Sequence, residues 1–300
     1  MNILVIGSAN ADLVITTDQM PILGQTIVGR DFSVNAGGKG LNQAVAISKL
    51  GGNVSFLGLV GNDANGQMLI DTFRQYGVRF AGKSLDHNST GIAAITVVGA
   101  DNFIILNPGA NGDMTPEFIA ENAHLIHKAD YIVLQLEIPT ETIVKICQLA
   151  NESKAKVILN PAPYKEIPEE VYSLIDYLIP NEHEAYGYTR ITLNSQEDCI
   201  AAVKKLQARG VANVIITLGE KGAVYNYQGQ ILFHPAEKVT AVDTTSAGDS
   251  FIGALVVKLS EGVELPDAVA FATKVSAITV SRKGAAKSIP YINEVEQKCC

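Results

Sequence analysis

The chain has 300 residues and a formal net charge of −8 at pH 7, from 23 basic and 31 acidic side chains. A chain this acidic is a poor candidate for nucleic-acid binding, which depends on basic patches that face phosphate. Apolar residues make up 47% of the sequence and charged residues 18%, which excludes wholesale disorder and allows a large core. No apolar run approaches the ~20 residues of a membrane span, and the segment before Gly7 does not resemble a signal peptide. We therefore expect no nucleic-acid partner and no membrane partner.

The four cysteines are too few and too scattered for a disulfide framework. Cys147 and Cys199 lie in helix-like patterns and are predicted to be buried thiols. Cys299 and Cys300 end the chain without the four-residue box of a prenylated tail, which favours a frayed terminus. The cysteine usage therefore predicts a protein of the reducing cytoplasm.

Strand-length apolar runs alternate with helical patterns along most of the chain, beginning with a buried strand over Ile3–Ile6. The other predicted strands of this pattern cover Val54–Val60, Tyr131–Leu136, Lys156–Leu159, Tyr177–Ile179 and Asn213–Thr217. The predicted helices cover Gly40–Leu50, Gly66–Tyr76, Glu141–Ala150, Gln196–Arg209, Phe251–Leu259 and Leu265–Val280. This alternation predicts an α/β fold in which helices cover both faces of a mainly parallel sheet.

Two stretches interrupt the alternation. Ala11–Thr17 and Gly91–Leu106 have the pattern of paired strands, with a hairpin-like turn at Gly99-Ala100-Asp101-Asn102. We expect them to form a small β-sheet that is inserted into the α/β domain from two separate places. The inserted segments span about residues 11–36 and 91–110 of a single domain that covers residues 1–300.

Gly77–Ser84 matches the phosphate-loop pattern G-x-x-x-x-G-K-[ST] literally. A working phosphate loop follows a strand and opens a helix, so that backbone N–H groups face the phosphates. Here a predicted helix precedes the pattern and strand-like residues follow it. Gly77 is therefore predicted to be a helix C-cap and not part of a phosphate site.

The segment Asp243–Leu255 has the order that phosphate chemistry needs, because small residues and Gly248 open directly into an apolar helix. Such a helix start exposes backbone N–H groups at the positive end of the helix dipole. Asp249 in the first turn has the ordinary alternative of a helix-start acid. That alternative explains neither Asp243 upstream nor the run of small residues that would admit a ligand.

Three further segments place glycines or polar residues where α/β sheets bind ligands. Gly37–Gln43 puts glycines at a helix start. Asn181–Glu184 follows a predicted strand, and its Asn and Glu can share a water or metal ion or simply cap a helix. Thr217–Gly222 ends a buried strand, where nucleotides bind and where ordinary turns also occur.

Taken together in this order, these segments resemble the ribokinase family, the phosphofructokinase-B-type sugar kinases. The resemblance covers essentially the whole chain and includes Gly7–Asp12, Gln135–Glu137, Asn160–Pro163 and Arg282–Ala285. It implies a ribokinase-like three-layer fold with a β-sheet lid. It also implies ATP-dependent phosphorylation of the primary hydroxyl of D-ribose, which gives D-ribose 5-phosphate.

The resemblance implies a role for each matching residue. Asp249 matches the general base that takes the proton of the attacking hydroxyl, and Ala247 and Gly248 match the anion hole for the γ-phosphate. The residues that match sugar contacts are Asn10, Asp12, Gly38, Lys39, Asn42, Glu137 and Asp249. The residues that match nucleotide contacts are Asn181, Thr217, Leu218, Gly219, Glu220, Lys221, Gly222, Gly248 and Thr273.

The resemblance also implies ions and a second copy of the chain. Glu184, with Asn181, matches the pair that organises Mg²⁺ through water. A monovalent cation site for K⁺ would lie beside the anion hole, mostly among backbone carbonyls. The residues that match this site are Asp243, Thr245, Thr279, Arg282, Gly284 and Ser288. The exposed lid sheet implies a homodimer in which two lids pack together.

Some positions depart from the family pattern. Thr273 stands where relatives often carry Asn or His near the adenine, which leaves the nucleotide preference open. Leu41 and Ser246 occupy positions where alanine or glycine is common, a mild change in shape near the substrate and the anion hole.

Alternative functions remain at this point. Within the same reaction class, the acceptor can be deoxyribose, another pentose or a nucleoside. A non-catalytic sugar- or nucleotide-sensing protein would need no base, and the presence of Asp249 beside Gly248 opposes it. A dinucleotide-dependent oxidoreductase would need G-x-G-x-x-G after the first strand, which Ile3–Gly7 does not provide.

Overall fold

The structure is a computed structural model that describes residues 1–99 and 101–297. Within those residues, its main element is a nine-stranded sheet. Seven neighbouring strands of this sheet pair in parallel, and the remaining two, β14 and β15, are added at one edge by antiparallel pairing. In spatial order, the strands are β15 (Gln230–His234), β14 (Ala223–Tyr227), β13 (Asn213–Thr217), β12 (Tyr177–Leu178), β11 (Lys156–Asn160), β10 (Tyr131–Gln135), β1 (Asn2–Ile6), β4 (Asn53–Leu57) and β6 (Arg79–Phe80).

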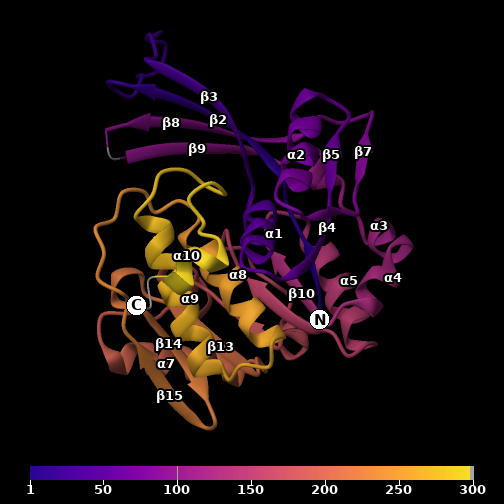
Figure 1. Cartoon of the computed structure of the whole chain (residues 1–300), viewed down its shortest axis with the longest axis vertical. Helices are drawn as coiled ribbons and strands as arrows, with labels where there is room; N and C mark the ends of the chain where they lie inside the picture. Colours follow the sequence, from indigo (N-terminus) through magenta and orange to yellow (C-terminus); the bar gives the residue numbers. More distant parts are fainter. Residues whose placement is uncertain (100, 298–300) are drawn as a thin grey trace.

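Helices cover both faces of this sheet (Figure 1). Alternate side chains along a strand point to opposite faces, so Ile3 and Val5 of β1 join one apolar cluster and Leu4 and Ile6 join the other. The first face carries α1 (Lys39–Lys49), α2 (Ala64–Gln75), α8 (Ala247–Ser260), α9 (Leu265–Val280) and α10 (Ile292–Gln297). The second face carries α3 (Pro116–Glu121), α4 (Ala123–Lys128), α5 (Thr140–Asn151), α6 (Glu182–Thr189) and α7 (Gln196–Ala208). The predicted three-layer α/β architecture is confirmed.

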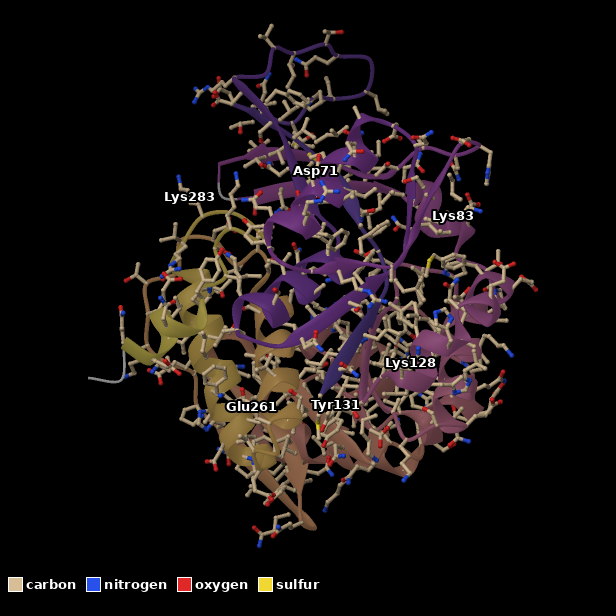
Figure 2. All side chains as sticks on the ribbon, turned by 45° about the vertical axis from the view of Figure 1, so that its right-hand side comes forward. Asp71, Lys83, Lys128, Tyr131, Glu261 and Lys283 are labelled. Atoms are coloured by element: carbon tan, nitrogen blue, oxygen red, sulfur yellow. The ribbon has the colours of Figure 1, made fainter. Side chains whose placement is uncertain are left out.

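Close packing joins α1 to α8, which brings two of the expected site segments together. A Cβ atom on Gly253 of α8 would lie 2.5 Å from the Cβ of Ala46 in α1, so only glycine allows this approach. The far end of α8 is tied to the sheet, where the Tyr131 hydroxyl donates to the carbonyl of Leu259 over 3.1 Å (Figure 2). The helix that begins at Ala247 is therefore held at its middle and at its far end.

A separate four-stranded sheet projects from the α/β body (Figure 1). Its order is β3 (Asp31–Gly37), β2 (Asn10–Thr17), β8 (Gly91–Val98) and β9 (Asp101–Asn107). The two hairpins meet through a parallel pairing of β2 with β8. The small sheet built from two separate segments is thus confirmed, while Ala100 of the expected turn lies outside the described residues.

One predicted strand is wrong. Val54–Val60 is divided at Gly58 into β4 and β5 (Leu59–Gly61), and β5 pairs with β7 (Lys83–Leu85) in a separate small sheet. A Cβ atom at Gly58 would lie 2.5 Å from the Phe56 ring and 2.8 Å from the carbonyl oxygen of Gly7. The chain therefore leaves the main sheet at the one residue that can pass so close to β1.

The structure also bears on three smaller points from the sequence: the glycine at the literal phosphate-loop match, the cysteines and membrane spans. Gly77, with φ of +71°, follows α2 and leads into β6, so the literal phosphate-loop match is only a helix end. Cys147 and Cys199 are buried free thiols, and burial raises the pKa of Cys147 to about 12. Cys299 and Cys300 lie outside the described residues. No helix within residues 1–99 and 101–297 is long and apolar enough to cross a membrane.

Candidate active site

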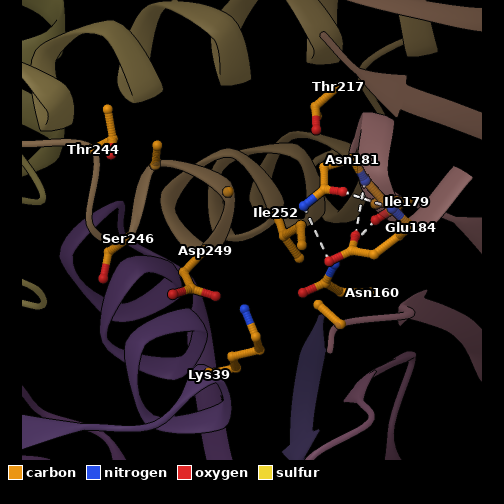
Figure 3. Close-up of a pocket in the computed structure, with 13 residues that line it drawn as sticks. Lys39, Asn160, Ile179, Asn181, Glu184, Thr217, Thr244, Ser246, Asp249 and Ile252 are labelled. Atoms are coloured by element: carbon orange, nitrogen blue, oxygen red, sulfur yellow. Dashed lines mark hydrogen bonds between the residues drawn. The ribbon is translucent and has the colours of Figure 1, made fainter. Parts of the chain in front are cut away.

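A pocket of about 180 Å³ lies at the carboxyl ends of the parallel strands, between the starts of α8 and α6 (Figure 3). It collects residues from all four segments that the sequence singled out. Its lining residues are Lys39, Asn160, Ala162, Ile179, Asn181, Glu184, Thr217, Thr244, Ser246, Ala247, Gly248, Asp249 and Ile252. This is the edge at which open α/β sheets bind their ligands.

The first turn of α8 presents backbone N–H groups to this pocket. The N–H of Ala247 donates to the carbonyl of Thr244 over 3.2 Å, and that of Ser250 donates to the carbonyl of Ser246 over 2.9 Å. Among the residues that the structure describes, the N–H groups of Gly248 and Asp249 have no such partner, as is usual for a first turn. A Cβ atom at Gly248 would have no atom within 4 Å, so the approach is open. An anion fits here, at the positive end of the helix.

Asp249 lies in the same turn and is buried. Its Oδ1 accepts a hydrogen bond of 3.0 Å from Nε2 of Gln43, and its Oδ2 accepts one of 3.2 Å from Nδ2 of Asn42. Burial raises the pKa of this carboxyl above its usual value, although the charge of Lys39 and the two amide donors act in the opposite direction. The group is therefore a carboxylate of increased basicity, as a general base requires.

Lys39 points into the pocket from the start of α1 (Figure 3). Burial lowers the pKa of its ammonium, but the carboxylates of Asp249, Glu137 and Glu184 outweigh that effect and hold the pKa above its usual value. The ammonium is thus charged at neutral pH and faces the space where an anionic ligand would lie.

The residues expected to contact a sugar adjoin this pocket at the root of the four-stranded sheet. Glu137 accepts a hydrogen bond of 3.1 Å from the backbone N–H of Lys39 and another from the Ser8 hydroxyl. Burial, followed by the charges of Glu137 and Asp249, raises the pKa of Asp12 to about 7. A Cβ atom on Gly37 would lie 2.1 Å from Oδ2 of Asp12, so this glycine makes room for the carboxyl. Gly38, with φ of +91°, precedes α1.

Sequence reasoning missed Asn111, which orients Asn10. Its side chain accepts from the N–H of Ala9 over 3.1 Å and donates to Oδ1 of Asn10 over 2.8 Å. Gly91 starts the neighbouring strand, and a Cβ atom there would lie 2.2 Å from Nδ2 of Asn111. The only sequence signal was a glycine-rich turn, Gly109-Ala110-Asn111, directly after a predicted strand.

Asn181 and Glu184 form a capping box at the start of α6. The Glu184 carboxylate accepts from the backbone N–H of Asn181 over 2.8 Å and from its Nδ2 over 3.1 Å. Both residues also line the pocket, so the capping role and a ligand role are compatible. Mg²⁺ bound with a nucleotide keeps several waters and needs only one or two carboxylates, which the buried Glu184 carboxylate beside the exposed Asn181 fits. Within the described residues, no cluster of three His, Cys, Asp or Glu side chains could hold a metal by itself.

Thr217 brings the end of β13 to the pocket, whereas residues 218–222 of the loop that follows are not among the lining residues. Gly219 and Gly222 have φ of +55° and +101°, and the N–H of Leu218 donates to the carbonyl of Gly222 over 2.8 Å. The Lys221 ammonium lies 3.7 Å from the carboxylate of Glu182. Thr273 of α9 is buried and is not among the lining residues, and its hydroxyl lacks a hydrogen-bond partner among the described residues.

Asp243 links the two segments that the sequence analysis assigned to one cation site. Its Oδ1 accepts from the N–H of Thr245 and its Oδ2 from the N–H of Gly284, both over 2.9 Å. Burial raises the pKa of Asp243, but these hydrogen bonds dominate and leave it below its usual value. Ser288 is buried and donates to the carbonyl of Ala285 over 2.8 Å, and the carbonyl of Thr279 accepts from the N–H of Arg282 over 3.1 Å. One ionised carboxylate beside several carbonyls suits a hard cation, which prefers oxygen ligands.

A basic carboxylate next to an open helix N-terminus, with a charged lysine facing both, defines an enzyme that transfers a phosphoryl group to a hydroxyl. The model of the pfkB family of carbohydrate kinases matches residues 1–292, and the chain belongs to this family. It is therefore a phosphotransferase that acts on a sugar hydroxyl.

Within this family, the chain is similar to ribokinases and deoxyribokinases over nearly its whole length. The chain is 42% identical to a ribokinase of Schizosaccharomyces pombe, over 99% of this chain and 97% of the relative. It is 35% identical to a deoxyribokinase of Salmonella typhimurium, over 99% and 98%. Among solved structures, the Arabidopsis thaliana ribokinase complexed with ribose and ATP has a TM-score of 0.93, with 31% identity and coverage of 98% and 97%.

Proposed function

We propose that this protein is an ATP-dependent kinase that phosphorylates the primary hydroxyl of D-ribose to give D-ribose 5-phosphate. The similarity to ribokinases over nearly the whole chain supports this assignment. The observation that carries it is the position of Asp249, which lies in the first turn of α8 and contacts the amides of α1.

In this proposal, Asp249 takes the proton of the sugar hydroxyl as the oxygen attacks the γ-phosphate. The N–H groups of the first turn of α8, at Ala247, Gly248 and Asp249, and the ammonium of Lys39 stabilise the charge on the transferred group. Because the N–H of Ala247 already donates to Thr244, the other two N–H groups are the main donors. The sugar hydroxyls are held by Asn10, Asp12, Asn42, Glu137 and the backbone beside Gly38.

We assign the nucleotide to the side of the pocket where Asn181 and Thr217 lie, from which it would extend over the loop 218–222, with Thr273 near the adenine. Mg²⁺ bound with ATP would neutralise phosphate charge beside Asn181 and Glu184. Glu184 would hold it through water, because both of its oxygens already accept from Asn181.

We also propose that K⁺ activates the enzyme through a site formed by Asp243 and Thr245 on one side and, on the other, by Thr279 at the end of α9 and by Arg282, Gly284 and Ser288 in the loop after it. The hydrogen bonds of Asp243 to both loops support a shared site next to α8. Initial rates in K⁺, Na⁺ and a large organic cation at matched ionic strength test the proposal, and equal rates would contradict it.

We further propose that the four-stranded sheet is a lid within a single domain and that it mediates a homodimer. Cross-strand partners share a face, and the pairs Ile15 with Phe32 and Ala94 with Ile105 place exposed apolar side chains together. We call this the apolar lid face; its exposed members are Ile15, Phe32, Val34, Phe103 and Ile105. A second copy of the sheet would cover it. The free thiols Cys147 and Cys199 support the reducing cytoplasm as the compartment.

A coupled assay of ADP release over a panel of sugars and nucleosides tests the proposed function. We expect kcat/KM to be highest for ribose. The similarity to deoxyribokinases makes 2-deoxyribose the main competing substrate, and Asn10 is the residue that we place nearest the 2-hydroxyl. A preference for 2-deoxyribose would overturn the ribose assignment, and a protein that binds sugar without ADP release would favour a sensor.

A further inference from the structure

We propose that Gln43 is a positioning residue for Asp249, and that Gln135 and Asn160 hold the Gln43 amide in the orientation that donates to this carboxylate. The proposal rests on the proposed role of Asp249 as general base. It concerns the amides that surround the base, of which Asn160 also lines the pocket.

The three amides form a continuous chain that ends on Asp249. Nε2 of Gln43 donates to Oδ1 of Asp249 over 3.0 Å and to Oδ1 of Asn160 over 3.2 Å. Oε1 of Gln43 accepts from Nε2 of Gln135 over 2.6 Å. Asn160, in turn, donates from Nδ2 to the carbonyl of Ile179 over 3.0 Å. Every polar atom of the Gln43 side chain therefore has a partner.

The partners determine which way the Gln43 amide points. An ionised carboxylate only accepts hydrogen bonds, so the NH₂ group of Gln43 must face Asp249. The donor of Gln135 meets the opposite, oxygen side of the same amide. A flipped amide would place oxygen against the carboxylate and NH₂ against NH₂, so the chain strongly favours one orientation.

These amides lie in the interior and come from different parts of the fold. Gln43 in α1 and Gln135 at the end of β10 each have 0% of their surface exposed. Gly7 at the end of β1 gives Gln135 its space, because a Cβ atom there would lie 2.0 Å from Oε1 of Gln135. Packing at the ends of three strands, β1, β10 and β11, therefore determines the geometry of the base.

The three hydrogen-bonded amides are one of several influences on the charge of Asp249. The charged groups that face this carboxylate are Lys39, which favours its ionised form, and Glu137, Asp12 and Glu184, which disfavour it. Gln43 and Asn42 add hydrogen bonds that favour the ionised form. Loss of the Gln43 donor is therefore expected to raise the pKa of Asp249 and to move the base away from its place.

The experiment compares wild type with Gln43→Met, which keeps the length and the apolar stem of the side chain. One readout is a ¹³C NMR titration of labelled aspartate carboxyls, with the Asp249 signal assigned by its absence in Asp249→Asn. The other readout is the pH profile of kcat. One hydrogen bond to a charged group corresponds to about one to two pKa units, so both readouts are expected to shift upward by about one unit. At neutral pH, kcat is expected to fall roughly tenfold while KM for the sugar changes less than about threefold.

Two more variants test the hydrogen-bonded amides Gln43 and Gln135. Gln43→Glu keeps the shape, adds an acid beside Asp249 and is expected to raise the pKa at least as much; it also serves if Gln43→Met does not fold. Gln135→Met leaves the contacts to Asp249 in place but frees the Gln43 amide, so a smaller upward shift is expected.

Thr142→Val is the matched control, because it removes another fully buried hydrogen bond, from the Thr142 hydroxyl to the carbonyl of Met114, far from the base. It is expected to lower the thermal midpoint without moving the pKa of Asp249. Gln43 variants that leave the Asp249 titration where wild type and Thr142→Val have it would overturn the inference. A shifted titration in a protein that phosphorylates no sugar would instead overturn the proposed function and leave the positioning of the carboxylate intact.

Discussion

Burial decides the chemistry of the individual carboxyl groups at this site. Asp249 and Asp12 both have raised pKa values, yet they differ in surroundings: Asp249 receives two amide hydrogen bonds, whereas burial and two acidic neighbours act on Asp12. A pair of carboxyls set apart in this way suits one as base and the other as a hydroxyl acceptor.

Replacement of Asp249 by Asn tests the base directly. The variant keeps the shape and a hydrogen-bonding side chain but cannot take a proton. Loss of a general base costs ~10²–10⁴ in rate, and because the base acts mainly in the transition state, sugar affinity is expected to stay within about tenfold. Steady-state kcat and sugar binding by calorimetry check this outcome, and a kcat within about threefold of wild type would contradict the assignment.

Asp12 gives a prediction about stability and pH. Its pKa is raised to about 7 in the folded protein from 3.8. Between those two values the folded state keeps a proton that the unfolded state loses, so the contribution of Asp12 to stability falls as pH rises from about 4 to about 7. A shift of this size corresponds to about 4 kcal/mol at most, and solvent screening of this half-buried group reduces it to about 1 kcal/mol.

Asp12→Asn, which is neutral at every pH, is therefore expected to be more stable than wild type by about 1 kcal/mol at pH 7.5 and equally stable near pH 4.5. Thermal unfolding of the sugar-free proteins across this range measures the difference. A stability difference that does not change with pH would show that the charge of Asp12 is not its cause. Sugar binding by the variant is expected to weaken, since an acceptor for hydroxyls is lost.

At the scale of a single element, the start of α8 carries a strained residue. Ser246 is the N-cap of this helix with φ of +60°, a conformation that costs a non-glycine residue about 1 kcal/mol. Its hydroxyl is buried and has no hydrogen-bond partner among the described residues. This geometry favours glycine at the position.

Ser246→Gly is expected to stabilise the protein by about 0.5–1 kcal/mol, because relief of strain and of an unpaired hydroxyl exceeds the added flexibility of glycine. Urea unfolding measures this change. Ser250→Gly in the same helix is the control, since Ser250 is helical and its hydroxyl donates to Ala247 over 2.9 Å; it is expected to destabilise by about 1 kcal/mol. If both variants destabilise equally, the strain at Ser246 has no energetic weight.

At the scale of the whole molecule, the four-stranded sheet leaves apolar surface uncovered. Phe32 and Ile105 on the apolar lid face are 65% and 60% exposed. Contiguous apolar surface of this kind usually marks an interface. The proposed homodimer would cover it and would bring two lids together.

Phe32→Ser with Ile105→Ser is expected to convert a dimer of twice 31.9 kDa into a monomer, as measured by light scattering. Tyr186→Ser is the control, since Tyr186 is an exposed aromatic residue on α6, away from the lid. The control is expected to remain dimeric. A wild-type protein that is monomeric at all concentrations would contradict the proposed interface.

The order of strands and helices follows from the sequence alone, because the signals that determine each element are local. The continuous apolar run of Ile3–Ile6 and the helical spacing in Gly40–Leu50 are each complete within a dozen residues. The glycine-rich helix starts at Gly37–Gln43 and Asp243–Leu255 are equally local, so both sides of the phosphate pocket were predictable as sites.

Tertiary structure decided how these segments meet. Gln43 contacts Gln135 across 92 positions and Asp249 across 206, and Asn10 meets Asn111 across 101. Local sequence patterns do not predict such pairs. A Gln or Asn looks the same in the sequence whether its amide faces water, a backbone carbonyl or a catalytic carboxylate. The division at Gly58 has the same cause: the strand ends where β1 and the Phe56 ring leave room for no side chain. Close packing between distant segments is a property of the folded chain, and it determines the orientation and the pKa of the groups that do the chemistry.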